Sequence, residues 1–100
     1  MEIRFADDDL DKLETDPRFA AGLPDAVVTS YRRAINYIRQ AVDERDIRKR
    51  KSFHFEKLQG DREGQYSLRL NLQWRLVVQL EGKAPSKVIV MCAVENYHKG

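Results

Sequence analysis

The sequence predicts an α+β fold in which two N-terminal helices pack on a twisted, mainly antiparallel sheet of four to five strands. In the first half of the chain, apolar residues recur at helical spacing, whereas in the second half they alternate with polar residues as in strands. The chain has 100 residues, of which 42% are hydrophobic and 34% are charged. This size and composition are typical of one globular domain, which we expect to span residues 1–100.

The N-terminal segment predicts a short strand followed by a short helix. Apolar and polar residues alternate over residues 2–6, which favours a strand. Asp7–Asp9 then provide an N-cap and an acidic first turn for a helix that carries Leu10 and Leu13. This helix is expected to end before Pro17, because proline cannot continue it.

The longest predicted helix begins at Pro24 and Asp25, because proline is tolerated at the first helical position. Its apolar residues form a stripe at helical spacing, which predicts an amphipathic helix with this stripe in the core. The stripe consists of Val27, Val28, Tyr31, Ala34, Ile35, Ile38, Ala41 and Val42. The opposite, exposed face carries Arg32, Arg33, Asn36, Arg39 and Gln40.

The second half of the chain predicts four strands that form a meander. They cover residues 53–58, 66–70, 74–80 and 88–94, with turn-rich segments between them. The last strand is apolar on both faces, which is typical of a central strand.

The strands over residues 66–70 and 74–80 form a hairpin, and one register brings every apolar residue opposite an apolar partner. It pairs Leu70 with Trp74, Leu68 with Leu76, and Tyr66 with Val78. The same register places Arg69 directly opposite Arg75 on the other face, where like charges repel each other. Either Glu56 or Glu63 neutralises this pair, or the two guanidinium groups bind an external phosphate.

Charge is distributed unevenly along the chain, although the net charge is only +2. Residues 1–16 contain seven acidic and two basic residues, whereas residues 45–51 contain five basic residues and one acidic residue. A basic face can bind a polyanion even when the net charge is near zero. The candidate phosphate ligands in this segment are Arg48, Lys49, Arg50 and Lys51. The alternative is that the segment is a solvated loop.

The two histidines are candidate groups for proton transfer. His54 lies between two phenylalanines, so on a strand it would face away from the core, on the side of Arg69 and Arg75. Tyr97 and His98 follow the apolar last strand and would join the same polar face. Such a set suits RNA cleavage, because a base activates the 2′-hydroxyl, an acid protonates the leaving oxygen and arginines stabilise the charge. Alternatively, the histidines are surface residues without a catalytic role.

Other kinds of site are not predicted. The histidines form no close ligand pair, so no metal or other cofactor is expected. Cys92 lies within the apolar last strand, which argues against a nucleophile, and a single cysteine forms no disulfide framework. The longest apolar run has seven residues, too short to span a membrane, and the N-terminus lacks the features of a secretory signal. We therefore expect a cytoplasmic protein.

Residues 54–75, HFEKLQGDREGQYSLRLNLQWR, contain a long motif. It reads leucine, x, Gly-Asp-Arg, x, Gly, x, aromatic, and then Arg-x-Asn-x-x-Trp-Arg, and it resembles the HigB branch of the RelE/ParE toxin superfamily. The closing Asn96-Tyr97-His98 is similar to the acid-tyrosine-histidine at the end of that branch. With the two leading helices, the resemblance covers essentially the whole chain.

The resemblance implies a type II toxin that cleaves mRNA in the A site of the 70S ribosome, paired with a helix-turn-helix antitoxin of the HigA kind. It implies catalytic roles for His54, Tyr97 and His98, a phosphate contact for Arg75, and a place for Lys57 in the lining of the site. Arg69 belongs to the same motif. The basic segment and the exposed helix arginines would contact ribosomal RNA, including 16S rRNA, through phosphates.

Asn96 departs from the pattern, because the family often has an aspartate at this position. An amide orients a neighbour by hydrogen bonding but neither accepts a proton nor stabilises an imidazolium by charge. Glu95 is expected on the opposite face of the strand, away from Asn96. Two alternatives therefore stay open: a ParE-like toxin that poisons DNA gyrase, and a catalytically weakened member kept for antitoxin binding and operon repression.

Overall fold

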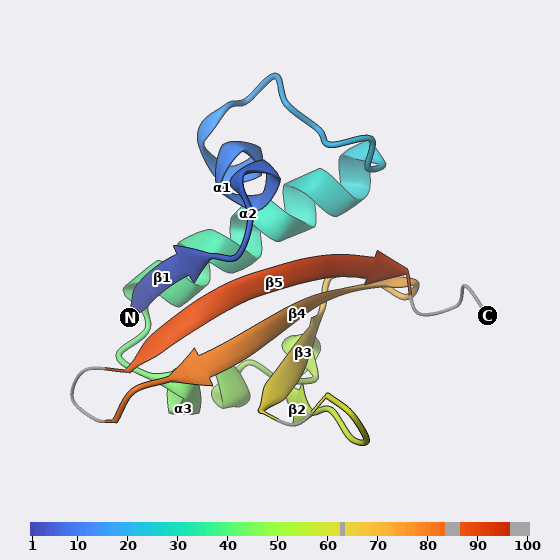
Figure 1. The fold of residues 1–100 in the computed structure, drawn as a ribbon. Helices are drawn as coiled ribbons and strands as arrows, with labels where there is room; N and C mark the ends of the chain where they lie inside the picture. The colour runs from blue at the N-terminus through green and yellow to red at the C-terminus, as the bar shows by residue number, and fades with distance from the viewer. Residues whose placement is uncertain (63, 84–86, 97–100) are drawn as a thin grey trace.

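The computed structural model describes residues 1–62, 64–83 and 87–96. Within these residues, α-helices α1 and α2 lie on one side of a curved sheet, and the short helix α3 lies near one end of it (Figure 1). The elements in chain order are β1 (Glu2–Phe5), α1 (Asp8–Thr15), α2 (Asp25–Gln40), α3 (Glu44–Lys49), the 3-10 turn η1 (Lys51–Phe53), β2 (Glu56–Lys57), β3 (Gln65–Arg69), β4 (Trp74–Glu81) and β5 (Val88–Asn96).

The five strands form one mixed sheet in the order β1-β5-β4-β3-β2. The first strand, β1, is parallel to β5, and every other neighbouring pair is antiparallel. The predicted α+β fold is therefore confirmed, with β5 inside the sheet as its apolar sequence indicated. A register shift between Val77 and Val78 interrupts the pairing of β4 with β5, and such bulges bend and twist a strand.

The helices form where their end signals and apolar spacing predicted them. Asp7 caps α1 by accepting a hydrogen bond from the Leu10 amide at 2.9 Å. Pro24, expected at the first helical position, is instead the N-cap of α2, so the helix begins at Asp25. The buried Tyr31 of α2 donates a hydrogen bond from its hydroxyl to the Leu10 carbonyl at 2.8 Å, so α1 is tied to α2 through the core.

Two arginines that were expected on the exposed face of α2 form intramolecular hydrogen bonds. Arg39 binds Glu14 of α1 through Nε at 2.7 Å and Nη2 at 2.6 Å. Arg32 donates hydrogen bonds to the carbonyls of Leu13, Asp16 and Phe19. Both side chains therefore hold α1 and the following loop, whereas Arg33 is exposed and forms no ion pair among the described residues.

The core lies between the helices and the sheet. It includes every predicted stripe residue of α2 from Val27 to Ile38, together with alternate residues of the strands. Val42 is the exception, with 81% of its surface exposed, because α2 ends at Gln40 before the stripe does. No helix of the described residues is long and apolar enough to cross a membrane.

The segment before β2 differs from the prediction. The expected strand over residues 53–58 is reduced to Glu56–Lys57, and the basic residues before it form α3 and η1 instead of a loop. Asp43 caps α3 by accepting a hydrogen bond from the Arg45 amide at 2.9 Å. Ile47 is the buried residue of this six-residue helix, and so short an element presents no apolar period that the sequence could reveal.

Candidate RNA-cleaving site

A small cleft of about 120 Å³ lies on the face of the sheet opposite α1 and α2. It is lined by His54, Glu56, Ser67, Arg69 and Arg75. The predicted hairpin register is confirmed, since β3 pairs with β4 through Tyr66–Val78, Leu68–Leu76 and Arg69–Arg75. Because paired residues share a face, the leucines enter the core and the two arginines enter the cleft.

The structure places His54 at this cleft in a backbone conformation that the sequence did not predict. It ends η1 in the left-handed backbone region, with φ 44° and ψ 51°, and its amide donates to the Lys51 carbonyl at 3.0 Å. The expectation that His54 lies on a strand is therefore wrong, although its position beside Arg69 and Arg75 is as expected. A left-handed conformation costs a residue with a Cβ roughly 1–2 kcal/mol, and such strain is concentrated at functional sites.

Of the two facing arginines, only Arg75 forms an ion pair among the described residues, and its partner lies in a third strand. Glu95 of β5 pairs with Arg75 and accepts hydrogen bonds from its Nε at 3.3 Å and its Nη2 at 3.0 Å. Arg62 binds the same carboxylate through Nη1 at 3.1 Å and Nη2 at 2.8 Å. Among the described residues, Arg69 forms no ion pair, and Glu56 lines the cleft without one.

The carboxylate of Glu95 is held in its charged form. The hydrogen bond from Arg62 is the largest cause and lowers the pKa of Glu95 below its ordinary value. Burial opposes this effect, and the hydrogen bond from Arg75 adds to the lowering. In the cleft, the guanidinium group of Arg75 thus forms an ion pair with a carboxylate, whereas that of Arg69 forms none among the described residues. The uncompensated charge favours an anionic ligand.

The pairing of β4 with β5 also places Asn96. Asn96 pairs with Trp74, which packs against the core, whereas Glu95 pairs with Arg75 on the cleft face. The predicted alternation of these two residues is therefore confirmed, but the residue that shares the cleft face is Glu95. Tyr97 and His98, the other predicted catalytic residues of this end, lie outside the described residues.

The other predicted basic residues lie around the cleft rather than in it. Lys57 pairs with Tyr66 and alternates with Glu56, so its side chain leaves the sheet on the other face. Arg48 lies over the ring of Phe55, 5.0 Å from its centroid, and Phe55 stacks on Tyr66 with 5.1 Å between the ring centroids. This stack gives Arg48 a fixed position beside β2.

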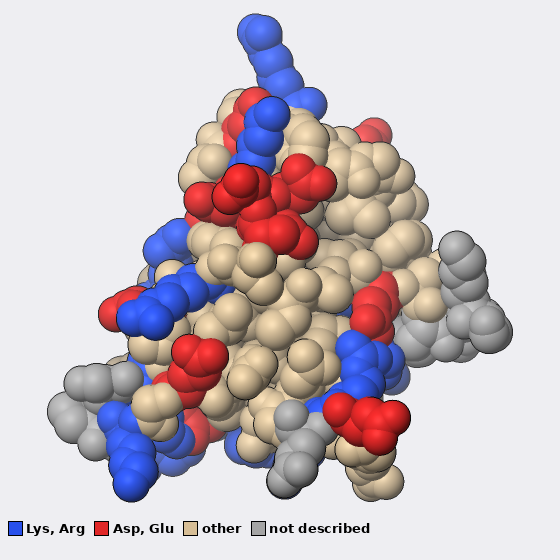
Figure 2. All heavy atoms as spheres, viewed as in Figure 1, with Lys and Arg blue, Asp and Glu red and all other residues tan. Residues whose placement is uncertain are grey.

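In α3, the Nζ of Lys49 lies 3.6 Å from the Oδ1 of Asp46. Lys51 is exposed in η1. The basic residues thus project from short ordered elements. Acidic side chains, by contrast, form a patch over α1 in Figure 2, where the first helical turn contains Asp8, Asp9 and Asp11. The acidic residues of α1 therefore lie on a different element from the basic residues of α3 and η1, as the sequence indicated.

The two contributions that the sequence did not reveal are those of Arg62 and Glu95. Neither residue could be placed from local pattern, because Arg62 lies in the loop before β3 and the register of β5 against β4 depends on the bulge between Val77 and Val78. A shift of one residue would move Glu95 to the other face of the sheet.

Other chemistry finds little support in the described part of the chain. Its His, Cys, Asp and Glu residues form no group of three or more that could hold a metal ion. Burial raises the pKa of the Cys92 thiol above its ordinary value, which makes this cysteine a poor nucleophile.

The family model of HigB-like toxins, described as RelE-like toxin of type II toxin-antitoxin system HigB, matches residues 3–91. The chain belongs to the HigB-like toxin family. This HigB-like protein is the toxin of a type II toxin–antitoxin system, and membership implies an antitoxin partner. The match includes the motif with His54, Arg69 and Arg75 and ends before Glu95.

The fold has a solved relative. The structure is similar to that of a YoeB/ParE toxin from Agrobacterium tumefaciens, with a TM-score of 0.61 and 20% sequence identity. The similarity covers 96% of this chain and 98% of the other, and at this identity it shows a shared fold. No curated relative matches the chain by sequence.

Proposed function

We propose that this HigB-like toxin is a ribosome-dependent endoribonuclease that acts in the cytoplasm, cleaves mRNA in the ribosomal A site and so inhibits translation. Toxins of the RelE, HigB and YoeB kind are generally endoribonucleases, which supports this class of reaction. The observation that carries the proposal is the cleft in which a strained histidine lies beside two arginines that face each other.

The chemistry needs no group from outside the protein. A base removes the proton of the 2′-hydroxyl, whose oxygen attacks the adjacent phosphorus and displaces the 5′-oxygen of the next nucleotide. The products are a 2′,3′-cyclic phosphate and a 5′-hydroxyl, after an acid has protonated the leaving oxygen. Arg69 and Arg75 stabilise the negative charge that grows on the phosphate oxygens.

His54 is one proton-transfer group in this proposal, and Tyr97 or His98 supplies the other. Asn96 orients its neighbours by hydrogen bonding, and Lys57 approaches the substrate from the other side of β2. The basic residues from Arg48 to Lys51 bind phosphates of 16S rRNA and mRNA, and a HigA-like helix-turn-helix protein is the antitoxin. Binding through phosphates makes ribosome association strongly dependent on salt.

Expression of the toxin without its antitoxin tests the proposal. Mapping of mRNA ends is expected to show cuts within translated codons and fragments with 5′-hydroxyl termini. A His54→Gln variant is expected to leave transcripts intact. Growth arrest with intact transcripts would contradict the nuclease, and accompanying DNA damage would instead indicate a ParE-like action on gyrase.

A weakened nuclease kept for operon repression is favoured by one observation, the amide at Asn96 on the core side of the sheet. The Asn96→Asp variant distinguishes the two cases. A large increase in cleavage by this variant would show that the natural chain is a weak enzyme, whereas similar rates would support an active nuclease.

A further inference from the structure

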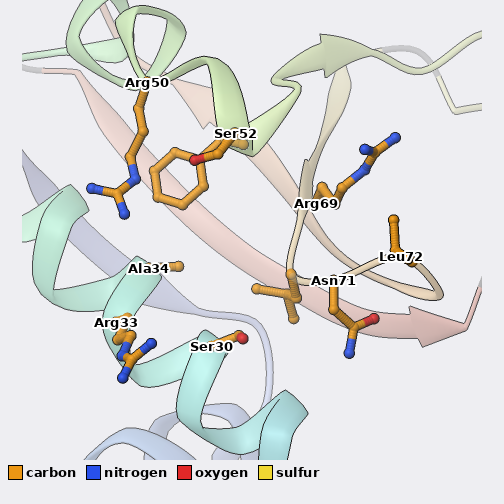
Figure 3. A pocket seen from close by; sticks show the side chains of 10 residues that line it. Ser30, Arg33, Ala34, Arg50, Ser52, Arg69, Asn71 and Leu72 are labelled. Atoms are coloured by element: carbon orange, nitrogen blue, oxygen red, sulfur yellow. The ribbon is translucent and has the colours of Figure 1, made fainter.

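A second cavity, of about 330 Å³, opens beside the cleft between α2, η1 and the turn that joins β3 to β4. Arg69 lines both cavities. Figure 3 shows the guanidinium groups of Arg33 and Arg50 on the same side of this cavity, whereas the head of Arg69 points away from it. The volume lies at the lower end of the range of small-molecule pockets, roughly 300–1,000 Å³.

The charge of this cavity is not compensated. Among the described residues, no carboxylate forms an ion pair with Arg33 or Arg50, although Arg39, Arg45 and Arg62 each have one. Two guanidinium groups that line one cavity repel each other, and a bound anion relieves that repulsion. The hydroxyls of Ser30 and Ser52 line the same space and provide further hydrogen-bond donors.

Arg50 is held in place before any ligand binds. Its guanidinium carbon lies 5.0 Å from the ring centroid of Tyr37 and 5.1 Å from that of Phe53. These rings meet edge to face with 5.3 Å between their centroids. Aromatic faces fix the orientation of a guanidinium without occupying its N–H groups, so Arg50 presents its donors at a defined position.

The far side of the cavity includes two leucines of the β3–β4 turn region. Leu72, at the tip of the β3–β4 turn, is 77% exposed and lines the cavity with Leu70. Asn71 fixes this turn, because its Oδ1 accepts hydrogen bonds from the Gln73 and Trp74 amides at 2.9 Å each. The cavity therefore offers donors for a phosphate at one end and an apolar surface for a nucleoside at the other.

We propose that this cavity is a second nucleotide subsite, which holds the nucleotide next to the scissile bond with its phosphate on Arg33 and Arg50. The proposal rests on the proposed function, because it takes the cavity, which shares Arg69 with the cleft, as the place where the cleaved RNA strand continues. It predicts that Arg33 and Arg50 bind substrate RNA without taking part in the chemical step.

The test uses a short fluorescein-labelled RNA in which every 2′-hydroxyl is methylated. This RNA keeps its phosphates but has no nucleophile, so binding is measured whether or not the toxin is a nuclease. Fluorescence anisotropy over a range of salt concentrations gives the dissociation constant and its salt slope. The proteins compared are the natural chain, Arg33→Gln, Arg50→Gln and the control Arg18→Gln, which removes an exposed charge that lines neither cavity.

We expect about tenfold weaker binding for Arg33→Gln and Arg50→Gln, as for the loss of a hydrogen bond to a charged group. The slope of log affinity against log salt should fall by about 0.7 for each lost phosphate contact to a single strand. Arg18→Gln should bind like the natural chain. The Arg33 variant keeps the result interpretable if Arg50→Gln, which loses its aromatic contacts, is poorly folded.

Unchanged affinity and slope in Arg33→Gln would overturn the subsite. So would variants that bind this RNA normally but lose affinity for ribosomes or for the antitoxin, because the cavity would then hold ribosomal RNA or a peptide. If the toxin cuts no mRNA in cells while both variants show the expected loss, the nuclease is contradicted but the binding of single-stranded RNA by Arg33 and Arg50 stands.

Discussion

Glu95 of β5 lies directly across from Arg75 of β4 and accepts a hydrogen bond from its Nη2 at 3.0 Å. The same carboxylate binds Arg62, so one acid connects the end of the sheet to the loop before β3. This connection fixes Arg75 at the edge of the cleft. Opposite it, Arg69 has no such partner among the described residues, and the two arginines therefore differ in what their removal does.

The carboxylate of Glu95 is expected to contribute stability that depends on pH. Its pKa is lowered in the folded protein, chiefly by Arg62, so the contribution is complete above the unfolded pKa of about 4.3 and is lost as pH falls through the folded pKa. Glu95→Gln should lower the free energy of unfolding by about 1 kcal/mol at pH 7, because these ion pairs are about one-third exposed. Urea unfolding at pH 7 and near pH 3 measures the difference, which should shrink at the lower pH.

Glu56→Gln is the matched control, since it removes the same charge from the same cleft and no ion pair among the described residues. Its effect should be smaller at both pH values. Equal losses in the two variants would show that the charge of the cleft as a whole matters, and not the contact of Glu95 with its arginines.

The strained backbone of His54 predicts that function and stability separate at this residue. With φ at 44°, glycine removes a conformational cost of roughly 1–2 kcal/mol, partly offset by its larger entropy in the unfolded chain. His54→Gly should therefore be more stable than His54→Ala by about 0.5–1 kcal/mol. Both variants should lose cleavage by about 10²–10⁴-fold, as for removal of a general acid or base.

Urea unfolding and primer extension on a translated mRNA measure these two properties of His54→Gly and His54→Ala. A glycine variant less stable than the alanine variant would mean that His54 is not held in the left-handed region. Cleavage at the natural rate in either variant would remove His54 from the mechanism.

The same substitution is expected to change stability differently at the two facing arginines. Arg69→Gln removes a like charge from across the strand pair and should raise the free energy of unfolding by a few tenths to about 1 kcal/mol. Arg75→Gln also removes that repulsion, but it loses the contact with Glu95 and should not be stabilising. Both variants should cleave RNA more slowly. Stabilisation by Arg75→Gln equal to that by Arg69→Gln would contradict this difference between the two arginines.

The fold was predictable where short-range pattern decides it. The stripe of α2 and the apolar partners of Leu68 and Tyr66 each allow one arrangement, because any other would expose apolar surface. The 3-10 turn before His54 was not predictable in the same way. Its conformation depends on Phe53 entering the core from a turn rather than from a strand, and alternation alone does not distinguish these cases.

The site was predictable as a set of residues but not as a set of contacts. Arg69, Arg75 and His54 were placed in one cleft from the hairpin register and the motif, whereas the partner of Arg75 was sought in Glu56 or Glu63. The structure assigns that role to Glu95, a residue of the next strand. Its position depends on the connection between β4 and β5, whose register the local pattern of apolar residues does not determine.

The C-terminal residues provide the last prediction. The sheet extends to Asn96, and Val94 packs against the core, so deletion of residues 97–100 removes no described strand residue. The free energy of unfolding should change by less than about 0.5 kcal/mol, as for most surface changes. Toxicity and mRNA cleavage should nevertheless be lost, because Tyr97 and His98 are the proposed partners of His54 in proton transfer.

Deletion of residues 99 and 100 is the matched control, since it shortens the chain but keeps both proposed catalytic side chains; it should stay toxic. Growth on induction, mRNA end mapping and urea unfolding are measured on both truncated chains. If the chain that ends at Asn96 still arrests growth and cuts mRNA, neither Tyr97 nor His98 transfers a proton. If it is inactive but also unfolded, Tyr97→Phe and His98→Gln in the full chain decide, because neither substitution shortens the sheet and each removes one proton-transfer group.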